Sequence, residues 1–438
     1  MCIRDSIDGE DAKDFDDAVY CAKNSNSFTL YVAIADVSFY VTPGSKIDRE
    51  AKKRGTSIYF PETVIPMLPE NLSNGICSLR PNEDRCSMIC EMSIGLDGKR
   101  KKYKFYSGLI NSKARLTYNQ VEKNLNKSFN IKQAGVRASI EHLKDLANLR
   151  LKLRHQRKAL EIKPIEATLE LDKNKEVKNL HIKKPLFAHK LVEESMLLAN
   201  ESAAEFMQER LNLGVYRIHE DPDPSKLEAL KKHFQISPKQ VKKLSSLEVV
   251  NLCLDQANKK NDTTGQILVL QTLARAEYST NNLGHFGLQL GQYSHFTSPI
   301  RRYPDLLVHR LINSSLAQKK IQTRQNELQD ECENSSMLER RAEKASRQVE
   351  QVLICTFLKT KIGSTMDGVV TGVTDFGLFV NLEPYFISGL LHVSDLPDDR
   401  YHFLPDRNAL KGKRRGGIYK LGQTIKVKIA AIFPLERK

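Results

Sequence analysis

Six carboxylates fall within ten residues near the amino terminus, directly before an apolar, strand-like segment. Two carboxylates about 5 Å apart repel by roughly 3 kcal/mol at an effective dielectric of about 20, so several can share a folded site only with protons, water or a cation between them. The EF-hand loop is excluded because its required glycine and final glutamate are missing. Carboxylates that hold Mg²⁺ and leave coordination positions open suit the phosphoryl chemistry of nucleases, whereas the alternative is an acidic, solvated loop. The six residues are Asp8, Glu10, Asp11, Asp14, Asp16 and Asp17.

A second chemical feature lies far downstream, where two arginines stand between two prolines in Pro299-Ile300-Arg301-Arg302-Tyr303-Pro304. Proline fixes its own φ and restrains the residue before it, so this segment should be stiff. Arginines presented in this way can grip a phosphate. If one of them faced the acidic cluster, the two segments would form a metal-and-arginine site for a phosphodiester. The alternative is a routine ion pair between Arg301 and Asp305.

Strands and helices must bring these segments together. The β-branched and aromatic residues of Thr29 to Val41 predict a strand, and the turn signal before it predicts a hairpin with Ala18 to Cys21. Apolar residues at helical spacing predict helices whose apolar stripes pack into a core. These helices are expected over 134–160, 188–211 and roughly 330–358.

The composition indicates a folded, basic protein of two or three domains. Lys and Arg total 68 against 53 Asp and Glu, a net charge of +15 that favours nucleic acid as a partner, with an acidic membrane surface second. After Thr360 the sequence alternates glycines with valines and phenylalanines, which predicts an all-β domain and a boundary near 358. The eight cysteines include no CxxC pair, and no apolar run is long enough to span a membrane, so a cytoplasmic protein without membrane contact is expected.

Four segments together resemble the catalytic (RNB) domain of the RNase II/RNase R family, most closely its RNase R branch. They are IDGEDAKDFDDAVYC, YFPETVIPMLPENLSNGICSL, HKLVEESMLLAN and HFGLQLGQYSHFTSPIRRYPDLLVHR. The resemblance implies an α+β architecture, with a mixed α/β RNB domain over 1–358 and a small all-β S1-type OB barrel over 359–438. It also implies a Mg²⁺-dependent, processive 3′-to-5′ exoribonuclease that acts on single-stranded RNA 3′ ends, releases nucleoside 5′-monophosphates and works as a monomer.

Residue roles follow from the same resemblance. Asp8, Asp14, Asp16 and Asp17 match the aspartates that hold Mg²⁺, and Arg301 matches the arginine that stabilises the scissile phosphate. Matches to RNA-contacting positions are Tyr59, Glu193, Arg302 and the S1 platform of Phe376, Phe379 and His392, flanked by Lys411, Lys413, Arg414 and Arg415. Tyr59 or Phe379 could instead be core aromatics, and Glu193 an exposed helix residue. The rival functions are a non-catalytic RNA-binding protein on the same fold and a metal-dependent phosphatase.

Three departures from the family pattern are expected to matter. Ile162 stands where an aromatic residue usually closes the clamp on RNA, so the grip on the terminal bases should be looser. No cold-shock domains precede Asp8, and residues 1–6 read as a non-native lead-in. Glu436-Arg437-Lys438 falls where the last OB strand should begin, which predicts an incomplete barrel with an unpaired edge.

Overall fold

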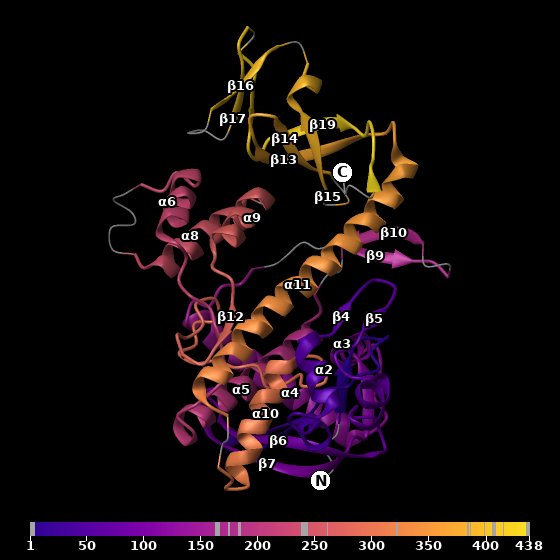
Figure 1. Ribbon diagram of the computed structural model, residues 1–438, viewed down its shortest axis with the longest axis vertical. Coiled ribbons are helices and arrows are strands. Elements are labelled where there is room, and N and C mark those ends of the chain that lie inside the picture. The colour runs from indigo at the N-terminus through magenta and orange to yellow at the C-terminus, as the bar shows by residue number, and fades with distance from the viewer. Residues whose placement is uncertain are drawn as a thin grey trace.

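The computed structural model shows a mixed α/β body and a β-rich region joined by one long helix (Figure 1). It describes residues 5–162, 167–173, 176–182, 185–237, 244–260, 262–320, 323–382, 385, 387–397, 399–404, 409–414 and 416–434. Arg415, residues 1–4 and Glu436 to Lys438 therefore lie outside the described residues. Within them, no helix has the length and apolar character needed to cross a membrane.

A six-stranded sheet forms the centre of the body. Its neighbours pair antiparallel except β1 and β8, which run parallel. Alternating apolar residues of the central strands, such as Leu30, Val32 and Ile34, are fully buried, as expected for strands that build a core. In spatial order the strands are β7 (Arg100–Asn111), β6 (Asp84–Gly95), β3 (Ser27–Ala35), β2 (Asp17–Lys23), β1 (Asp5–Asp8) and β8 (Ala114–Thr117).

The strand predicted over Thr29 to Val41 is correct only as far as Ala35. There the chain turns into the short helix α1 (Val37–Tyr40). The cause is Asp36, whose buried carboxylate accepts hydrogen bonds from Ser38 Oγ at 2.6 Å and from Asn313 Nδ2 at 3.3–3.4 Å. A buried carboxylate must keep such partners, so the chain leaves the sheet. The predicted hairpin is confirmed, because β2 pairs antiparallel with β3.

Two helices pack on this sheet where apolar spacing predicted them, and a further helix packs on one of these. Helix α4 (Ala134–Gln156) lies against β2, and α5 (Phe187–Arg210) lies against β3. Helix α10 (Tyr303–Leu316) packs on α5, with Leu306, Val308 and Ile312 fully buried. The remaining elements around the sheet are α2 (Lys46–Arg54), β4 (Ile58–Tyr59), β5 (Val64–Ile65), η1 (Asn71–Ile76), α3 (Tyr118–Leu125), β9 (Ala167–Leu171) and β10 (Val177–Ile182).

A smaller helical unit has its own apolar cluster beside the main core. Leu227, Val250 and Cys253 are buried in it, and Ile162 packs against it. The unit is joined to the body through the paired strands β11 (Tyr216–Ile218) and β12 (Glu277–Ser279). Its helices are α6 (Pro224–His233), α8 (Ser246–Lys259) and α9 (Thr263–Thr272).

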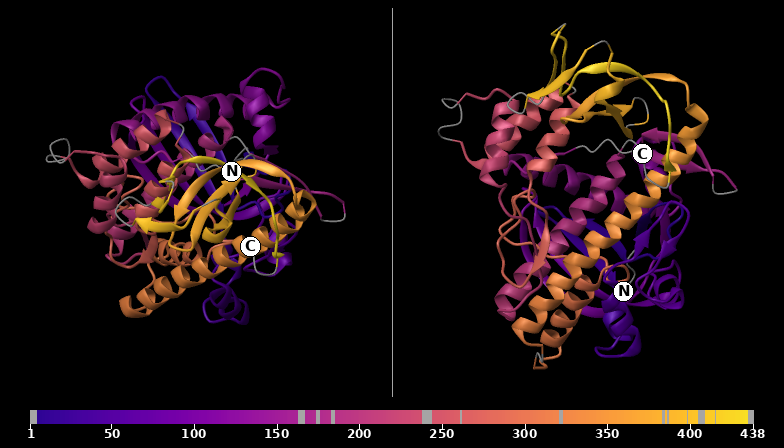
Figure 2. Two further views of the ribbon diagram at one scale, coloured as in Figure 1. Left: turned by 90° about the horizontal axis from the view of Figure 1, so that it is seen from above. Right: turned by 45° about the horizontal axis from the view of Figure 1, so that its top comes forward.

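Helix α11 (Gln325–Leu358) runs diagonally along the body (Figure 1). Its C-terminal end leads to the β-rich region, which lies at one end of the molecule (Figure 2). At 1.5 Å per residue its 34 residues span about 51 Å. The short η2 (Lys359–Lys361) leads into two small sheets around Val370, Leu378 and Leu410. One sheet has the order β15 (Ile387–His392), β14 (Gly377–Leu382), β13 (Thr365–Val373), β19 (Thr424–Lys428), with η3 (Val393–Asp395) after β15; the other has β16 (Tyr401–Leu404), β17 (Ala409–Gly412), β18 (Ile418–Lys420).

Candidate active site

The four predicted aspartates lie on or between two neighbouring strands. Asp8 ends β1 and Asp17 begins β2, so the connecting segment must fold back over the sheet edge. Ser78 holds this segment: its hydroxyl donates to the Lys13 carbonyl at 2.9 Å and accepts the Phe15 N–H at 3.0 Å. The aspartates are therefore carried by an anchored loop rather than by a free, solvated one.

The segment that carries Arg301 is held in place by hydrogen bonds at both its backbone and its side chain. The Arg301 carbonyl accepts hydrogen bonds from the Ser57 N–H at 2.9 Å and from Thr56 Oγ1 at 3.0 Å. Its guanidinium donates through Nη2 to Ser298 Oγ at 3.0 Å. Because both ends of the residue are held, the guanidinium is presented in one direction, as the two flanking prolines predicted.

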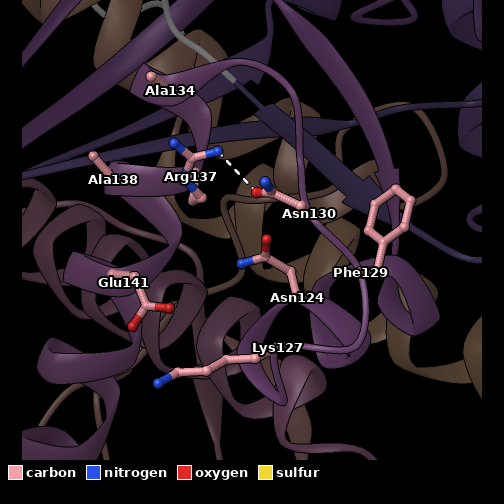
Figure 3. Close-up of a pocket in the computed structure, with 8 residues that line it drawn as sticks. All are labelled: Asn124, Lys127, Phe129, Asn130, Ala134, Arg137, Ala138 and Glu141. Atoms are coloured by element: carbon pink, nitrogen blue, oxygen red, sulfur yellow. Dashed lines mark hydrogen bonds between the residues drawn. The ribbon is translucent and has the colours of Figure 1, made fainter.

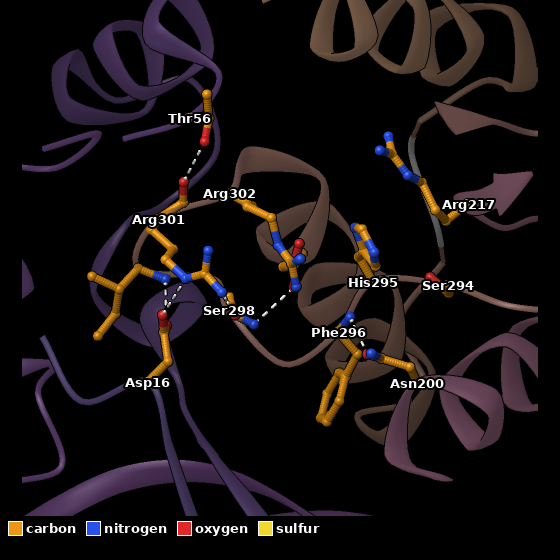
Figure 4. A network of polar contacts seen from close by, with 12 residues as sticks. Asp16, Thr56, Asn200, Arg217, Ser294, His295, Phe296, Ser298, Arg301 and Arg302 are labelled. Atoms are coloured by element: carbon orange, nitrogen blue, oxygen red, sulfur yellow. Dashed lines mark hydrogen bonds and ion pairs between the residues drawn. The ribbon is translucent and has the colours of Figure 1, made fainter. Parts of the chain in front are cut away.

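Asp16 joins the two segments directly (Figure 4). Its Oδ1 accepts the Ile300 N–H at 2.9 Å, and its Oδ2 lies 3.6 Å from Arg301 Nε. Only 5% of Asp16 is exposed, so this carboxylate is a structural link as well as a charge in the site. The predicted meeting of the acidic cluster with Arg301 is present in the structure.

A cavity of about 610 Å³ opens at this junction. It contains every residue that the sequence proposed for the catalytic centre, together with Tyr59, Glu193 and Arg302. Phe376, Phe379 and His392 of the β-rich region lie elsewhere. The lining residues are Asp8, Asp11, Ala12, Asp14, Asp16, Asp17, Tyr59, Val64, Tyr118, Val192, Glu193, Met196, Leu197, Asn200, Tyr293, Thr297, Ser298, Arg301 and Arg302.

Burial raises the pKa of two carboxyl groups in this cavity, so their ionised forms need a compensating positive charge. Desolvation raises the pKa of Asp17 to about 7, and the nearby charge of Asp8 adds to this while Arg301 opposes it. Burial likewise raises the pKa of Asp16 well above its usual value, despite Arg301 and the Ile300 N–H. A bound cation would stabilise the ionised carboxylates, as metal ions in such sites do.

The donor set fits a hard cation that also takes ligands from a substrate. Carboxylate oxygens are the donors that such cations prefer. Among the described residues, no three His, Cys, Asp or Glu side chains already surround one point closely enough to hold an ion. The four aspartates line one cavity without surrounding a single point, and their role as metal ligands stays a prediction.

Tyr59 stands at the end of β4 with 43% of its surface exposed, so it is not a core aromatic. Its hydroxyl donates to Asp14 Oδ2 at 3.1 Å, and its carbonyl accepts a hydrogen bond from Ser346 Oγ of α11 at 2.7 Å. Burial of the hydroxyl, followed by the charge of Asp14, raises the Tyr59 pKa. The Tyr59 hydroxyl is therefore neutral, and these hydrogen bonds hold the ring at the cavity wall.

Glu193 is neither free nor simply solvated. It forms ion pairs with Arg154 and, at 2.7 Å, with Lys190. Burial alone would raise the pKa of its carboxyl, but the hydrogen bonds from Lys190 and Arg154 outweigh burial and lower it. Glu193 therefore presents an ionised carboxylate on the wall of the cavity.

The alternative pairing of Arg301 with Asp305 is wrong, because Asp305 binds the other arginine. Arg302 Nη2 lies 2.7 Å from Asp305 Oδ1, and the same oxygen accepts the Ser298 N–H at 2.8 Å. Asp305 is completely buried, so this pair stiffens the segment from inside. Arg301 keeps its guanidinium available, and a direct contact of Arg302 with RNA stays a prediction.

Sequence reasoning missed several cavity residues from other segments. Tyr118 begins α3 and stacks on His189 with ring centroids 4.1 Å apart. Asn200 accepts the Phe296 N–H at 2.8 Å and donates to the Tyr293 hydroxyl at 3.1 Å. No local spacing identifies them, because each is ordinary in its own segment and becomes part of a site only through packing.

The predicted aromatic platform lies on the outer face of β14 and its neighbours. Phe376 and Phe379 are 45% and 38% exposed, with ring centroids 6.1 Å apart, whereas Leu378 and Val380 are buried. Phe379 is therefore not a core residue. His392 pairs in register with Gly377 and its Nδ1 lies 2.8 Å from Ser394 Oγ. Ile162, by contrast, packs on the helical unit and is not among the residues that line the cavity.

Comparison with known proteins agrees with this arrangement. The RNB domain matches residues 5–318, and the S1 RNA binding domain matches residues 359–432. The chain is 39% identical to Ribonuclease R of Vibrio cholerae, over 98% of this chain and 54% of the relative, and 39% identical to Ribonuclease R of Escherichia coli, over 99% and 55%. It thus spans about half the length of the curated relatives that it matches.

A solved structure extends the likeness to three dimensions. Mycoplasma genitalium RNase R in complex with ribose methylated single-stranded RNA superimposes with a TM-score of 0.94 at 31% identity, covering 100% of this chain and 70% of that chain. The resemblance found in the sequence and the expected succession of an RNB domain and an S1 domain are confirmed. The chain belongs to the RNB-domain family of ribonuclease R.

Proposed function

We propose that this protein is a Mg²⁺-dependent, processive 3′-to-5′ exoribonuclease that hydrolyses single-stranded RNA to nucleoside 5′-monophosphates. The observation that carries the proposal is the convergence of Asp8, Asp14, Asp16 and Asp17 with Arg301 on one cavity. Direction, processivity and the form of the product come from membership of the family and not from the residues of the site.

The chain's own residues would perform distinct tasks in phosphodiester cleavage. Arg301, held by Ser298 and Asp16, aims a positive charge at the position where negative charge grows on the phosphate. Preorganised charges of this kind stabilise a transition state without moving during the reaction. Tyr59 offers its exposed ring for stacking of the terminal base, and Glu193 offers hydrogen-bond acceptors at the cavity wall.

Mg²⁺ is the metal that the donor set suits. It is commonly held by one or two carboxylates together with substrate phosphates and water, which matches an open group of aspartates. When bound, the ion would polarise the phosphate and lower the pKa of water. Asp8, Asp14, Asp16 and Asp17 would hold it, and their negative charge would in turn be compensated.

RNA would also contact the S1 region. The exposed rings of Phe376 and Phe379 form a stacking surface, with His392 on the adjacent strand. Lys411, Lys413 and Arg414 follow on or just after β17 and would attract phosphates. The free state of the seven described cysteines is typical of a reducing compartment, and we propose a cytoplasmic monomer, for which light scattering is the test of the oligomeric state.

Replacement of Asp16 by Asn tests the catalytic proposal. Asparagine keeps an oxygen for the Ile300 N–H but removes the charge, so hydrolysis should fall by at least about 100-fold. The measurement is a time course of product lengths from a 5′-labelled single-stranded oligoribonucleotide, with Mg²⁺ and with EDTA. Unchanged cleavage in either the Asp16→Asn protein or EDTA would refute the mechanism.

The matched control is Glu10→Gln, which removes an exposed carboxylate from the same loop without touching the cavity. It should cleave within twofold of the unaltered protein. If the unaltered protein bound the oligoribonucleotide without shortening it in Mg²⁺, the non-catalytic RNA-binding alternative would be correct. Release of phosphate from small esters with no dependence on RNA length would favour the phosphatase alternative.

A further inference from the structure

A second cavity of about 580 Å³ lies at the far end of helix α3 from the candidate active site. Tyr118 at the first turn of α3 lines the catalytic cavity, whereas Asn124 in its last turn lines the second one. Tyr118 and Asn124 are six residues apart, which corresponds to about 9 Å along the helix. The lining residues, drawn in Figure 3, are Asn124, Lys127, Phe129, Asn130, Ala134, Arg137, Ala138 and Glu141.

The loop that forms this cavity is held in place by its own polar contacts. Arg137 Nη1 donates to Asn130 Oδ1 at 2.8 Å and to the Ile131 carbonyl at 2.9 Å. The Ile131 N–H donates to Asn124 Oδ1 at 3.3 Å. Asn124 is a buried amide whose oxygen is used in this way, and its Nδ2 group points into the space between the loop and α4 (Figure 3). The cavity is therefore preformed.

The charges around the cavity favour an anion with further polar edges. Lys127 and Arg137 line it with positive charge, and Glu141, the acidic member, is partly compensated by Lys144 at 3.6 Å. Guanidinium and ammonium groups of this kind bind phosphate. The amide of Asn124 and the carboxylate of Glu141 add one donor and one acceptor, which a simple inorganic anion would not use together.

An aromatic ring completes the set. Phe129 is 43% exposed at the rim of the cavity, and a base stacked on an exposed ring gains about 1–3 kcal/mol. We propose that this cavity binds a nucleoside monophosphate unit, with the phosphate at Arg137, the base on Phe129 and the base edge at Asn124. The unit belongs either to a free nucleotide or to a single-stranded RNA passing over α3. Binding here does not require hydrolysis.

Calorimetric titration of the full chain with AMP in EDTA tests the site without turnover. The background is Arg301→Gln, which removes the phosphate contact of the catalytic cavity. In that background, Phe129→Ala should weaken AMP binding about 10-fold, because it removes one stacking contact. Phe129 is exposed, so its loss should leave the fold intact, and circular dichroism checks this. Arg137→Gln should weaken binding by a similar factor.

The matched control is Lys132→Gln, which removes an exposed cation from the same loop but outside the cavity lining. It should bind AMP within twofold of the parent. AMP affinity that is unchanged in Phe129→Ala, or inorganic phosphate binding as tightly as AMP, would overturn the proposal.

A short single-stranded oligoadenylate, titrated in the same buffer, distinguishes the two sources of the nucleotide unit. If Phe129→Ala weakens the oligomer as much as it weakens AMP, the unit is part of an RNA chain. If only AMP is weakened, the cavity takes free nucleotides; both results support a nucleotide site. Because EDTA stops hydrolysis in all arms, failure of this site is separate from failure of the proposed exoribonuclease activity, which the cleavage assay measures.

Discussion

The candidate active-site cavity and the S1 platform are both proposed to bind RNA, but through different interactions. The cavity offers buried charges, and the platform offers exposed aromatic rings. In the cavity, Asp16 is almost fully buried and shares its two oxygens between Ile300 and Arg301. On the platform, Phe379 of β14 and Phe376 in the turn before it are only partly buried. Buried charges interact strongly because little water screens them, so each needs a partner of opposite charge or a hydrogen bond. Exposed rings make weaker contacts that accept any base.

This difference teaches which steps each region can control. Buried charge can favour a transition state over a ground state, because its effect depends on where charge develops. Exposed stacking holds the substrate and its transition state equally, so it affects binding alone. Changes in the cavity should therefore alter kcat, and changes on the platform should alter KM.

The largest effect is expected at Arg301. Arg301→Lys keeps the charge but loses the planar fork that reaches Ser298 and Asp16 together, so kcat should fall about 10²- to 10³-fold with little change in KM. Steady-state cleavage of a labelled oligoribonucleotide gives kcat and KM, and single-turnover cleavage reports the chemical step alone. The control Arg340→Lys alters a surface arginine paired with Glu277 and should stay within twofold. A defect confined to KM would remove the distinction between the two regions.

A second expected effect concerns acid stability of the RNB region. Burial, followed by the charges of His219 and Arg217, lowers the pKa of His285 to about 3. Below pH 6.5 the unfolded chain takes up a proton on this ring that the folded chain refuses, so the free energy of unfolding falls as the pH drops. Between pH 7.5 and pH 5 the unaltered protein should lose about 2 kcal/mol more than His285→Gln.

Urea unfolding followed by circular dichroism measures this difference. Glutamine retains an acceptor for the Leu288 N–H that His285 Nδ1 now accepts at 3.2 Å, so both proteins should fold at pH 7.5. Equal losses in the two proteins on acidification would show that His285 is accessible to protons in the folded state. The segment around His285 would then be less protected from water than its burial indicates.

The smallest effect is expected on the platform. Phe379→Ala should raise KM for single-stranded RNA about 10-fold at constant kcat, since one stacking contact is worth about 1–3 kcal/mol. Steady-state kinetics on oligoribonucleotides of increasing length provide the measurement. Ile418→Ala is the control, because it removes an equally exposed apolar side chain from the other S1 sheet. A drop in kcat for Phe379→Ala would contradict a purely binding role.

Much of this molecule could be predicted where the signal is local. The hairpin of β2 and β3, the helices α4, α5 and α11, and the change to short strands after residue 360 all follow from periodicity and turn residues within one window. The end of β3 at Ala35 could not be predicted, because it depends on Asn313 reaching Asp36 from α10. The sequence could not predict which arginine pairs with Asp305 either. Arg301 and Arg302 are adjacent, and only the direction of each side chain decides the pairing.

The sequence by itself determined the chemistry available: a crowd of carboxylates, two arginines on a stiff segment, and a basic, glycine-rich C-terminal region of short strands that contains aromatics. Only the tertiary structure decided which of these groups meet. It paired Arg302 with the buried Asp305, left Arg301 beside Asp16, and added Tyr118, Asn200 and Tyr293 to the cavity, which carry no local signal. The physical reason is that burial and hydrogen bonding between distant segments depend on packing, which no window of neighbouring residues contains.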